Sequence, residues 1–187
     1  MPADGPYRVA GIAGSLRLGS FNRALLRTAQ EVAPPSLAID IHEIGLLPLF
    51  NQDVEDEKVP DAAAALSQAV READGLLIVT PEYNHGVPGV LKNAIDWLSR
   101  PPRHSALDGK PTALMGASAG MTGTARAQSQ LRQSFVFTNT YAVPQPEVLV
   151  GRAHEKFDAA GTLTDERTRK FLVTFLEQFA VWITRMR

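Results

Sequence analysis

The sequence predicts an α/β protein in which a parallel β-sheet is covered by helices on both faces. Short apolar runs alternate along the chain with longer stretches of helical period, about five of each. This alternation indicates a parallel sheet, because each right-handed crossover between parallel strands needs a connecting segment, usually a helix. The length of 187 residues matches one domain of ordinary size, so we expect residues 1–187 to form a single domain.

Each predicted strand is a short run rich in apolar residues. Ile39 and Ile41 alternate with polar neighbours, whereas residues 75–80 are almost continuously apolar, as expected of a strand that is covered on both faces. A fifth strand is expected within 135–150, where Pro144 and Pro146 interrupt it. The other four strands are predicted at Arg8–Ala13, Leu37–Ile44, Gly75–Thr80 and Pro111–Ala117.

The predicted helices lie between these strands. Asp61 is placed to cap the second helix, and the last helix carries apolar residues at the i, i+3, i+4, i+7 spacing of an amphipathic helix. The segment Leu46–Pro60 contains two prolines and several acids, and it is predicted to be a long loop. The five helices are expected at Phe21–Val32, Asp61–Ala73, Gly89–Ser99, Met121–Gln133 and from Thr164 onward.

Composition and charge exclude several classes of function. Nineteen basic and twenty acidic residues give a formal net charge of -1 without a basic stripe, so we expect no nucleic-acid partner. The chain has no cysteine and its four histidines show no close ligand spacing, so thiolate chemistry is excluded and no metal site is predicted. The start Met1–Pro6 lacks the basic and apolar segments of a signal peptide, and no apolar stretch approaches the ~20 residues of a membrane span. We therefore expect a soluble, cytoplasmic protein with no membrane contact.

Parallel sheets bind ligands where their strands end, so the loops after the first, third and fourth strands are the expected site. The first loop, Gly14–Asn22, is rich in glycine and serine and opens a helix, which makes it a candidate anion site. Ser15, Ser20 and Asn22 add neutral donors, and Arg17 can add a charge-assisted hydrogen bond. Ser20 stands where a phosphate-binding P-loop needs lysine, and the glycines do not have the spacing of a dinucleotide fingerprint. A single terminal phosphate fits this loop; a plain turn with a serine cap is the alternative.

The loop after the third strand is the most distinctive run in the chain. It reads TPEYNHGVPGVLKNAIDW over residues 80–97. Pro81 and Pro88 stiffen it, while its glycines let the backbone approach a flat ligand. Tyr83 can cover part of a ring face, and the main-chain N–H groups of residues 82–84 can reach the edge of the ring. The alternative is a structural loop in which Asp96 and Trp97 serve packing.

The loop after the fourth strand offers a different chemistry. Gly116–Gly120 matches the Gly-x-Ser-x-Gly pattern of a nucleophile elbow. A serine hydrolase would then use Ser118, with Glu147 as the acid and His154 as the base. The chain is short for an α/β-hydrolase, and an oxyanion-hole glycine run is missing from it.

The first and third of these loops together resemble the NADPH-dependent FMN reductase family of flavodoxin-like proteins. The resemblance extends from Val9 to about Val150 and is carried mainly by the run from Pro81 to Trp97. It implies a flavodoxin-like three-layer sandwich, with a five-stranded parallel sheet of order 2-1-3-4-5 and FMN at the carboxyl ends of the strands. It also implies homodimers, which often pair into homotetramers.

The resemblance further implies an oxidoreductase whose chemistry occurs on the flavin, so no catalytic side chain is predicted. NADPH (or NADH) would pass hydride to FMN, and FMN would then reduce a small-molecule electron acceptor in a ping-pong scheme. The acceptors of the family include quinones, azo compounds, metal oxyanions such as chromate, and free flavin. A flavodoxin-type electron carrier is the alternative, although such carriers are strongly acidic. The residues implied in cofactor binding are Ser15, Arg17, Ser20, Phe21, Asn22, Pro81, Glu82, Tyr83, Asn84, Ser118 and Gly120.

The segment Pro88–Arg100 is the expected dimer contact. Its helix is apolar over more than one face, with Leu91 among the surplus apolar residues. A helix that contacts one sheet needs a single apolar stripe, so the surplus predicts a second burial surface.

Overall fold

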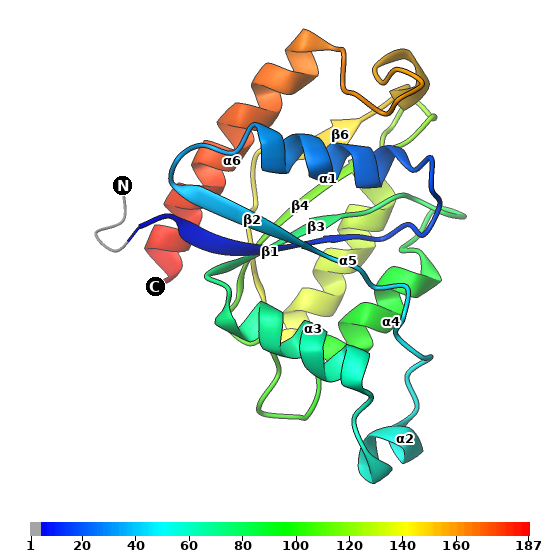
Figure 1. The fold of residues 1–187 in the computed structure, drawn as a ribbon, viewed down its shortest axis with the longest axis vertical. Helices are drawn as coiled ribbons and strands as arrows, with labels where there is room; N and C mark the ends of the chain where they lie inside the picture. Colours follow the sequence, from blue (N-terminus) through cyan, green and yellow to red (C-terminus); the bar gives the residue numbers. More distant parts are fainter. Residues whose placement is uncertain (1–4) are drawn as a thin grey trace.

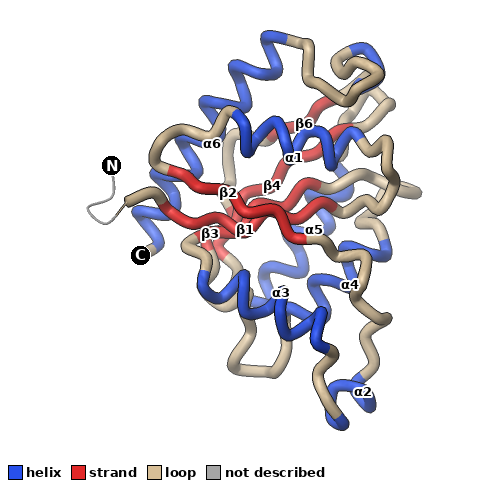
Figure 2. The backbone as a smooth tube through the Cα atoms, viewed as in Figure 1, coloured by secondary structure: helices blue, strands red, loops and turns tan. Residues whose placement is uncertain are grey.

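The computed structural model places the strands in one parallel sheet of order β2-β1-β3-β4-β5 (Figures 1 and 2). It describes residues 5–187, so most of the start Met1–Pro6, from which no signal peptide is expected, lies outside the described residues. The first four strands are β1 (Tyr7–Ala13), β2 (Leu37–His42), β3 (Gly75–Val79) and β4 (Pro111–Ala117). The predicted flavodoxin-like strand order is confirmed.

The fifth position in the sheet is filled by two short strands instead of one. β5 (Tyr141–Ala142) pairs with the start of β4, and β6 (Val148–Val150) pairs with its end. Between them lie Pro144 and Pro146, which have no N–H group to donate to a ladder. The prediction of a single interrupted fifth strand is therefore corrected to two separate strands.

Two helical layers cover the sheet, because successive residues of a strand point to opposite faces. On one face α1 (Phe21–Glu31) and α6 (Glu166–Met186) bury alternate strand residues such as Val9 and Leu77. The other face is covered by α3 (Asp61–Glu72), α4 (Gly89–Leu98) and α5 (Ala125–Thr138), which bury residues such as Ile12 and Ile78 (Figures 1 and 2). A single turn of 3-10 helix, η1 (Ala153–Glu155), precedes α6. None of the helices within residues 5–187 has the combined length and hydropathy that a membrane span requires.

Two expectations about the segment before α3 and about its N-cap are corrected. The predicted loop 46–60 contains the short helix α2 (Gln52–Glu57), whose residues are all at least partly exposed and so give no apolar period. It is capped by the Asn51 side chain and fixed by an ion pair of 2.7 Å between Glu55 and Arg100. The N-cap of α3 is Pro60, so Asp61 is its first residue and makes no capping hydrogen bond.

α5 begins and ends later than the predicted helix 121–133. Gly123 has a φ of +60° and holds the preceding residues in a turn, so the helix begins at Ala125. The buried Phe135, the first residue of the range predicted to contain the fifth strand, belongs to α5. The helix ends at Thr138, where Asn139 takes a left-handed conformation with φ of 53°.

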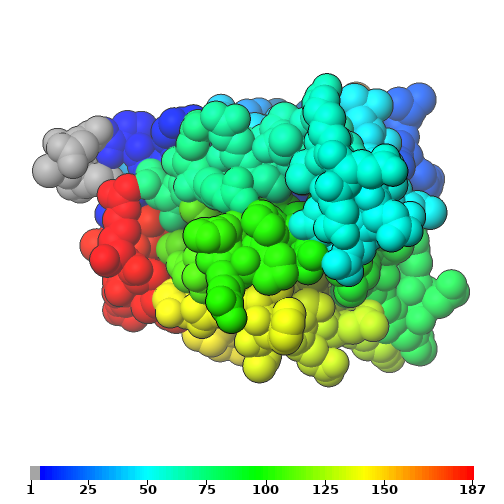
Figure 3. All heavy atoms as spheres, turned by 90° about the horizontal axis from the view of Figure 1, so that it is seen from below, coloured from blue at the N-terminus to red at the C-terminus, as the bar shows by residue number. Residues whose placement is uncertain are grey.

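The surplus apolar face of α4 is covered by the same chain. Leu91 is 0% exposed within the core, and the Trp97 indole N–H donates to Pro48 O at 2.8 Å. The Phe50 ring packs edge-on against Trp97 with centroids 5.0 Å apart. Figure 3 shows this segment of residues 46–57, in cyan, lying against the green part of the chain. The prediction that Leu91 belongs to a free dimer surface is therefore wrong.

Replacing Leu91 tests this burial. Leu91→Ala should lower the free energy of unfolding by about 2–5 kcal/mol, because it leaves a cavity between α4 and the sheet. Urea unfolding followed by circular dichroism measures the loss. Val181→Ala, at a position that is 50% exposed on α6, is the matched control and should change the stability much less. Equal stability of the two variants would contradict the burial of Leu91.

Candidate functional site

Three loops meet at the carboxyl edge of the sheet. Ala13, Val79 and Met115 are register partners on β1, β3 and β4, and each lies at the end of its strand or within two residues of it, so the loops that follow start at one edge of the sheet (Figure 1). An added Cβ on Gly14 would lie 3.3 Å from Pro81 Cδ, which shows how closely the first two loops approach. This edge is where the sequence predicts the site.

The first loop presents a continuous run of free donors. Within the described residues, no main-chain N–H from Ser15 to Phe21 has a hydrogen-bond partner. The Ser20 Oγ caps α1 by accepting from the N–H groups of Asn22 and Arg23 at 3.2 and 3.3 Å. Free N–H groups and the positive end of a helix dipole both favour an anion here. The Arg17 side chain is exposed beside them and can add a positive charge.

Asn22 has a structural task that the sequence does not reveal. Its Nδ2 donates to Ala117 O at 2.8 Å, and its Oδ1 accepts from Ala117 N at 2.8 Å. The carboxamide therefore joins α1 to the end of β4. This leaves Asn22 only one amide N–H for the donor role that the sequence suggests.

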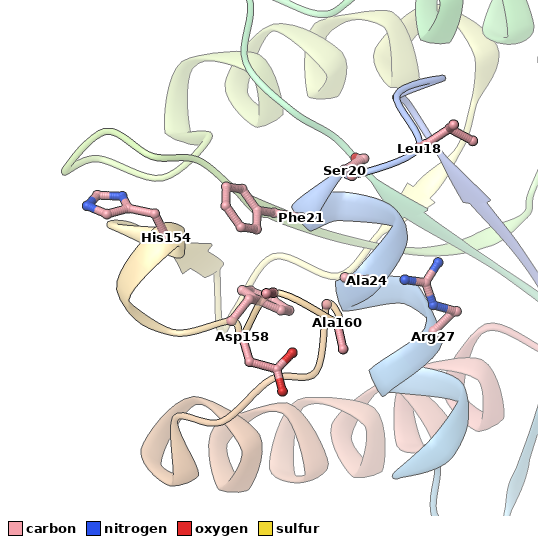
Figure 4. Close-up of a pocket in the computed structure, with 12 residues that line it drawn as sticks. Leu18, Ser20, Phe21, Ala24, Arg27, His154, Asp158 and Ala160 are labelled. Carbon is pink, nitrogen blue, oxygen red and sulfur yellow. The ribbon is translucent and has the colours of Figure 1, made fainter.

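The Phe21 ring points to another part of the molecule. It packs against Phe157 with centroids 5.6 Å apart, in a cavity of about 480 Å³ between α1 and residues 154–161. Figure 4 shows Phe21 projecting from α1 toward the side of this cavity where His154 lies. The main-chain N–H of Phe21 belongs to the row of unpaired N–H groups in the first loop, whereas its ring belongs to this cavity.

The second loop folds into a tight hairpin turn. Tyr83 and Gly86 exchange main-chain hydrogen bonds of 3.1 and 3.0 Å, and both central residues have positive φ, 51° at Asn84 and 62° at His85. This is the geometry of a type I′ turn. The Tyr83 N–H is therefore already used, which corrects the expectation that all three N–H groups of residues 82–84 are free. Those of Glu82 and Asn84 have no partner among the described residues.

The side chains of this loop divide between solvent and the protein. Tyr83 is 46% exposed, so its ring can cover a ligand. The Glu82 carboxylate instead accepts from the N–H groups of Arg126 and Ala127, at 2.9 and 3.2 Å, in the first turn of α5. The Arg126 guanidinium completes the contact at 3.3 Å. Sequence reasoning missed this role, since no local pattern connects residues 44 positions apart.

The third loop does not form a catalytic triad. The Ser118 Oγ accepts from Gly120 N at 3.0 Å, and the Ser118 N–H donates to Val150 O. His154 lies 3.7 Å from Glu155, and within residues 5–187 no hydrogen bond joins it to Ser118. The hydrolase alternative therefore gains no support. Ala119 and Met121 keep their N–H groups without partners in the described chain.

Exposed apolar side chains surround the site. Leu18 is 94%, Leu46 is 83% and Met121 is 86% exposed, and the three come from the loops after β1, β2 and β4. An added Cβ on Gly45 would lie 3.2 Å from Leu16 Cδ2, so the first two of these loops touch. In the described residues, no group of three or more histidines and acids could hold a metal ion. The site can therefore hold a flat organic ligand with an anionic end, using main-chain donors and an apolar rim.

Comparison with known proteins agrees with this geometry. The family described as NADPH-dependent FMN reductase matches residues 7–155. An NAD(P)H-dependent FMN reductase of Pseudomonas aeruginosa is 46% identical over 180 residues, which cover 96% of this chain and 97% of that protein. A quinone reductase of Pseudomonas putida is 48% identical over 177 residues, which cover 95% of each protein.

A solved structure extends the comparison to three dimensions. FerB, a flavoenzyme NAD(P)H:(acceptor) oxidoreductase from Paracoccus denitrificans, has a TM-score of 0.87 and 37% sequence identity, and the match covers 96% of this chain and 98% of FerB. The resemblance carried by the loops after β1 and β3 is thus confirmed along most of the chain. The chain belongs to the NADPH-dependent FMN reductase family.

Proposed function

We propose that the protein is an FMN-dependent NAD(P)H oxidoreductase that reduces quinones. The observation that carries this proposal is the run of free N–H groups from Ser15 to Phe21, next to those of Glu82 and Asn84. A phosphate and the polar edge of a flavin need such donors at two neighbouring places. When bound, FMN accepts hydride from the reduced nicotinamide and supplies two electrons to the acceptor.

The residues of the three loops would bind different parts of FMN. Ser15, Ser20 and Arg17, with the free N–H groups around them, would hold the phosphate. The N–H groups of Glu82 and Asn84 would donate to the ring edge while Tyr83 covers its face. Those of Ala119 and Met121, beside Ser118 and Gly120, would stabilise negative charge at the pyrimidine edge.

The rim of the site favours a quinone among the acceptors of the family. Leu18, Leu46 and Met121 offer apolar contact to a flat, uncharged ring. An oxyanion such as chromate would compete with the FMN phosphate for Arg17 and for the same free N–H groups. Azo compounds and free flavin are also flat, and we place them second. Since both substrates would use one open flavin face, we propose a ping-pong order.

We propose that the protein forms a homodimer through the C-terminal half of α5. With α4 covered by its own chain, the exposed apolar pair Val136 and Phe137 offers a better contact, being 84% and 92% exposed. Phe137 also lines a hollow of about 310 Å³ with Arg100 and Pro102.

The reductase proposal predicts a yellow protein with a defined response to NADPH. Purified protein should show flavin absorption near 450 nm (roughly, for an oxidised flavin) that NADPH bleaches and a benzoquinone restores. With excess NADPH, quinone consumption should be continuous. Absorption that NADPH leaves unchanged would favour the electron carrier, and a colourless protein unable to take up FMN would contradict the proposal.

Arg17 tests the phosphate site. Arg17→Ala should weaken FMN binding by about 1.5–3 kcal/mol, the contribution of one charge-assisted hydrogen bond. Titrating the apoprotein with FMN and following flavin fluorescence gives the dissociation constant. Arg8→Ala, at the opposite end of β1, is the matched control and should bind like the wild type. An unchanged dissociation constant in Arg17→Ala would remove this side chain from the site.

The dimer proposal is tested at Phe137. Phe137→Asp places a carboxylate in the apolar contact and should convert the dimer to monomers at micromolar concentration, as measured by light scattering. Glu177→Gln, an exposed change on α6, should leave the mass of the dimer unchanged. A wild-type monomer, or a Phe137→Asp dimer as tight as the wild type, would contradict this contact.

A further inference from the structure

The hairpin between β3 and α4 is attached to α5 at both of its ends. At the first end, the Glu82 carboxylate accepts from the N–H groups of Arg126 and Ala127. At the second end, the Gln130 Oε1 accepts from the Val87 N–H at 2.7 Å. The two ends thus contact the first two turns of the same helix.

The second attachment lies close to the glycine of the turn. A Cβ added to Gly86 would lie 2.7 Å from the Gln130 Oε1, so the side chain of Gln130 is seated directly against this glycine. The Glu82 side chain is only 8% exposed, and its contacts go to α5. The Glu82 carboxylate and the Gln130 Oε1 are therefore both engaged in contacts within the protein.

The turn between the attachments needs such support. Asn84 and His85 both have positive φ, at 51° and 62°, which is uncommon for residues other than glycine. Conformations of this kind persist where the surrounding structure holds them. The two hydrogen bonds of Tyr83 with Gly86 hold the turn from inside, and Glu82 and Gln130 hold it from outside.

We propose that Glu82 and Gln130 are positioning residues for the cofactor site. They hold the hairpin against α5, and thereby aim the free N–H groups of Glu82 and Asn84 at the edge of the flavin. Because α5 also follows the loop after β4, the same helix sets both loops relative to each other. This inference rests on the proposed FMN site, and its test separates the two.

Gln130→Ala is the most informative variant, since it removes one acceptor and leaves the Glu82 contact in place. In the ligand-free protein, amide hydrogen exchange of Val87 should become several-fold faster, while the free energy of unfolding stays close to that of the wild type. FMN affinity should fall about three- to tenfold, as expected from loss of one hydrogen bond. The absorption bands of bound FMN should also shift, because donors at the ring edge have moved.

Two further variants show whether the acceptor atom is responsible. Gln130→Glu keeps an oxygen for the Val87 N–H and should restore both the slow exchange and the affinity. Gln133→Ala, one turn further along the exposed side of α5, should behave like the wild type. In the double variant of Glu82→Gln with Gln130→Ala, the losses of affinity should not be additive, because both changes act on one turn.

The possible results distinguish the failure of this inference from the failure of the proposed function. Fast Val87 exchange and weaker FMN binding in Gln130→Ala, restored by Gln130→Glu, would support the inference. Wild-type exchange and affinity in Gln130→Ala would overturn it and leave the proposed function intact. A wild-type protein that binds no FMN would overturn both.

Discussion

The parallel register of β1, β3 and β4 is the constraint on which the rest of the site depends. Ala13, Val79 and Met115 lie side by side, so three loops leave the sheet at one edge. Past the ends of these strands, main-chain N–H groups in the loops after β1, β3 and β4 have no partner within the described residues and are left for a ligand. Asn22 fixes the row by joining the start of α1 to Ala117 at the end of β4. Donors from distant parts of the sequence are thus brought to one place without a charged catalytic cluster.

Helix α5 also organises the site, because it contacts two of the three loops. It begins after the loop that follows β4, and its first two turns contact Glu82 and Val87 of the loop that follows β3, the latter through Gln130. The other helices of the same face, α3 and α4, pack on the sheet, and α4 also contacts the segment of residues 46–57. One helix therefore links two edges of the proposed flavin site, while the first loop is positioned separately by α1.

Sequence reasoning was strongest where the chain carries local information. The parallel sheet and the donor-rich loop before α1 follow from hydrophobic alternation and from glycine and serine placement, whereas the strand order follows from the family resemblance; all three are present in the structure. It failed where the decisive contact is distant. The capping of α5 by Glu82, the use of Asn22 on β4 and the cover over α4 all join residues more than forty positions apart. Hydrophobic periodicity within one segment does not reveal its contacts with distant segments. For this reason the sequence predicted a free apolar face on α4.

FMN is proposed to bind to the carboxyl-edge loops through their main-chain N–H groups. The most direct measurement is a ¹H–¹⁵N spectrum of the apoprotein recorded during titration with FMN. The largest shifts are expected at the amides of residues 15–21, at Glu82 and Asn84, and at Ala119 and Met121. The Tyr83 amide, already bonded to Gly86, should shift less than its two neighbours. Shifts concentrated around the hollow lined by Arg100 and Phe137, with these loops unchanged, would contradict the claim.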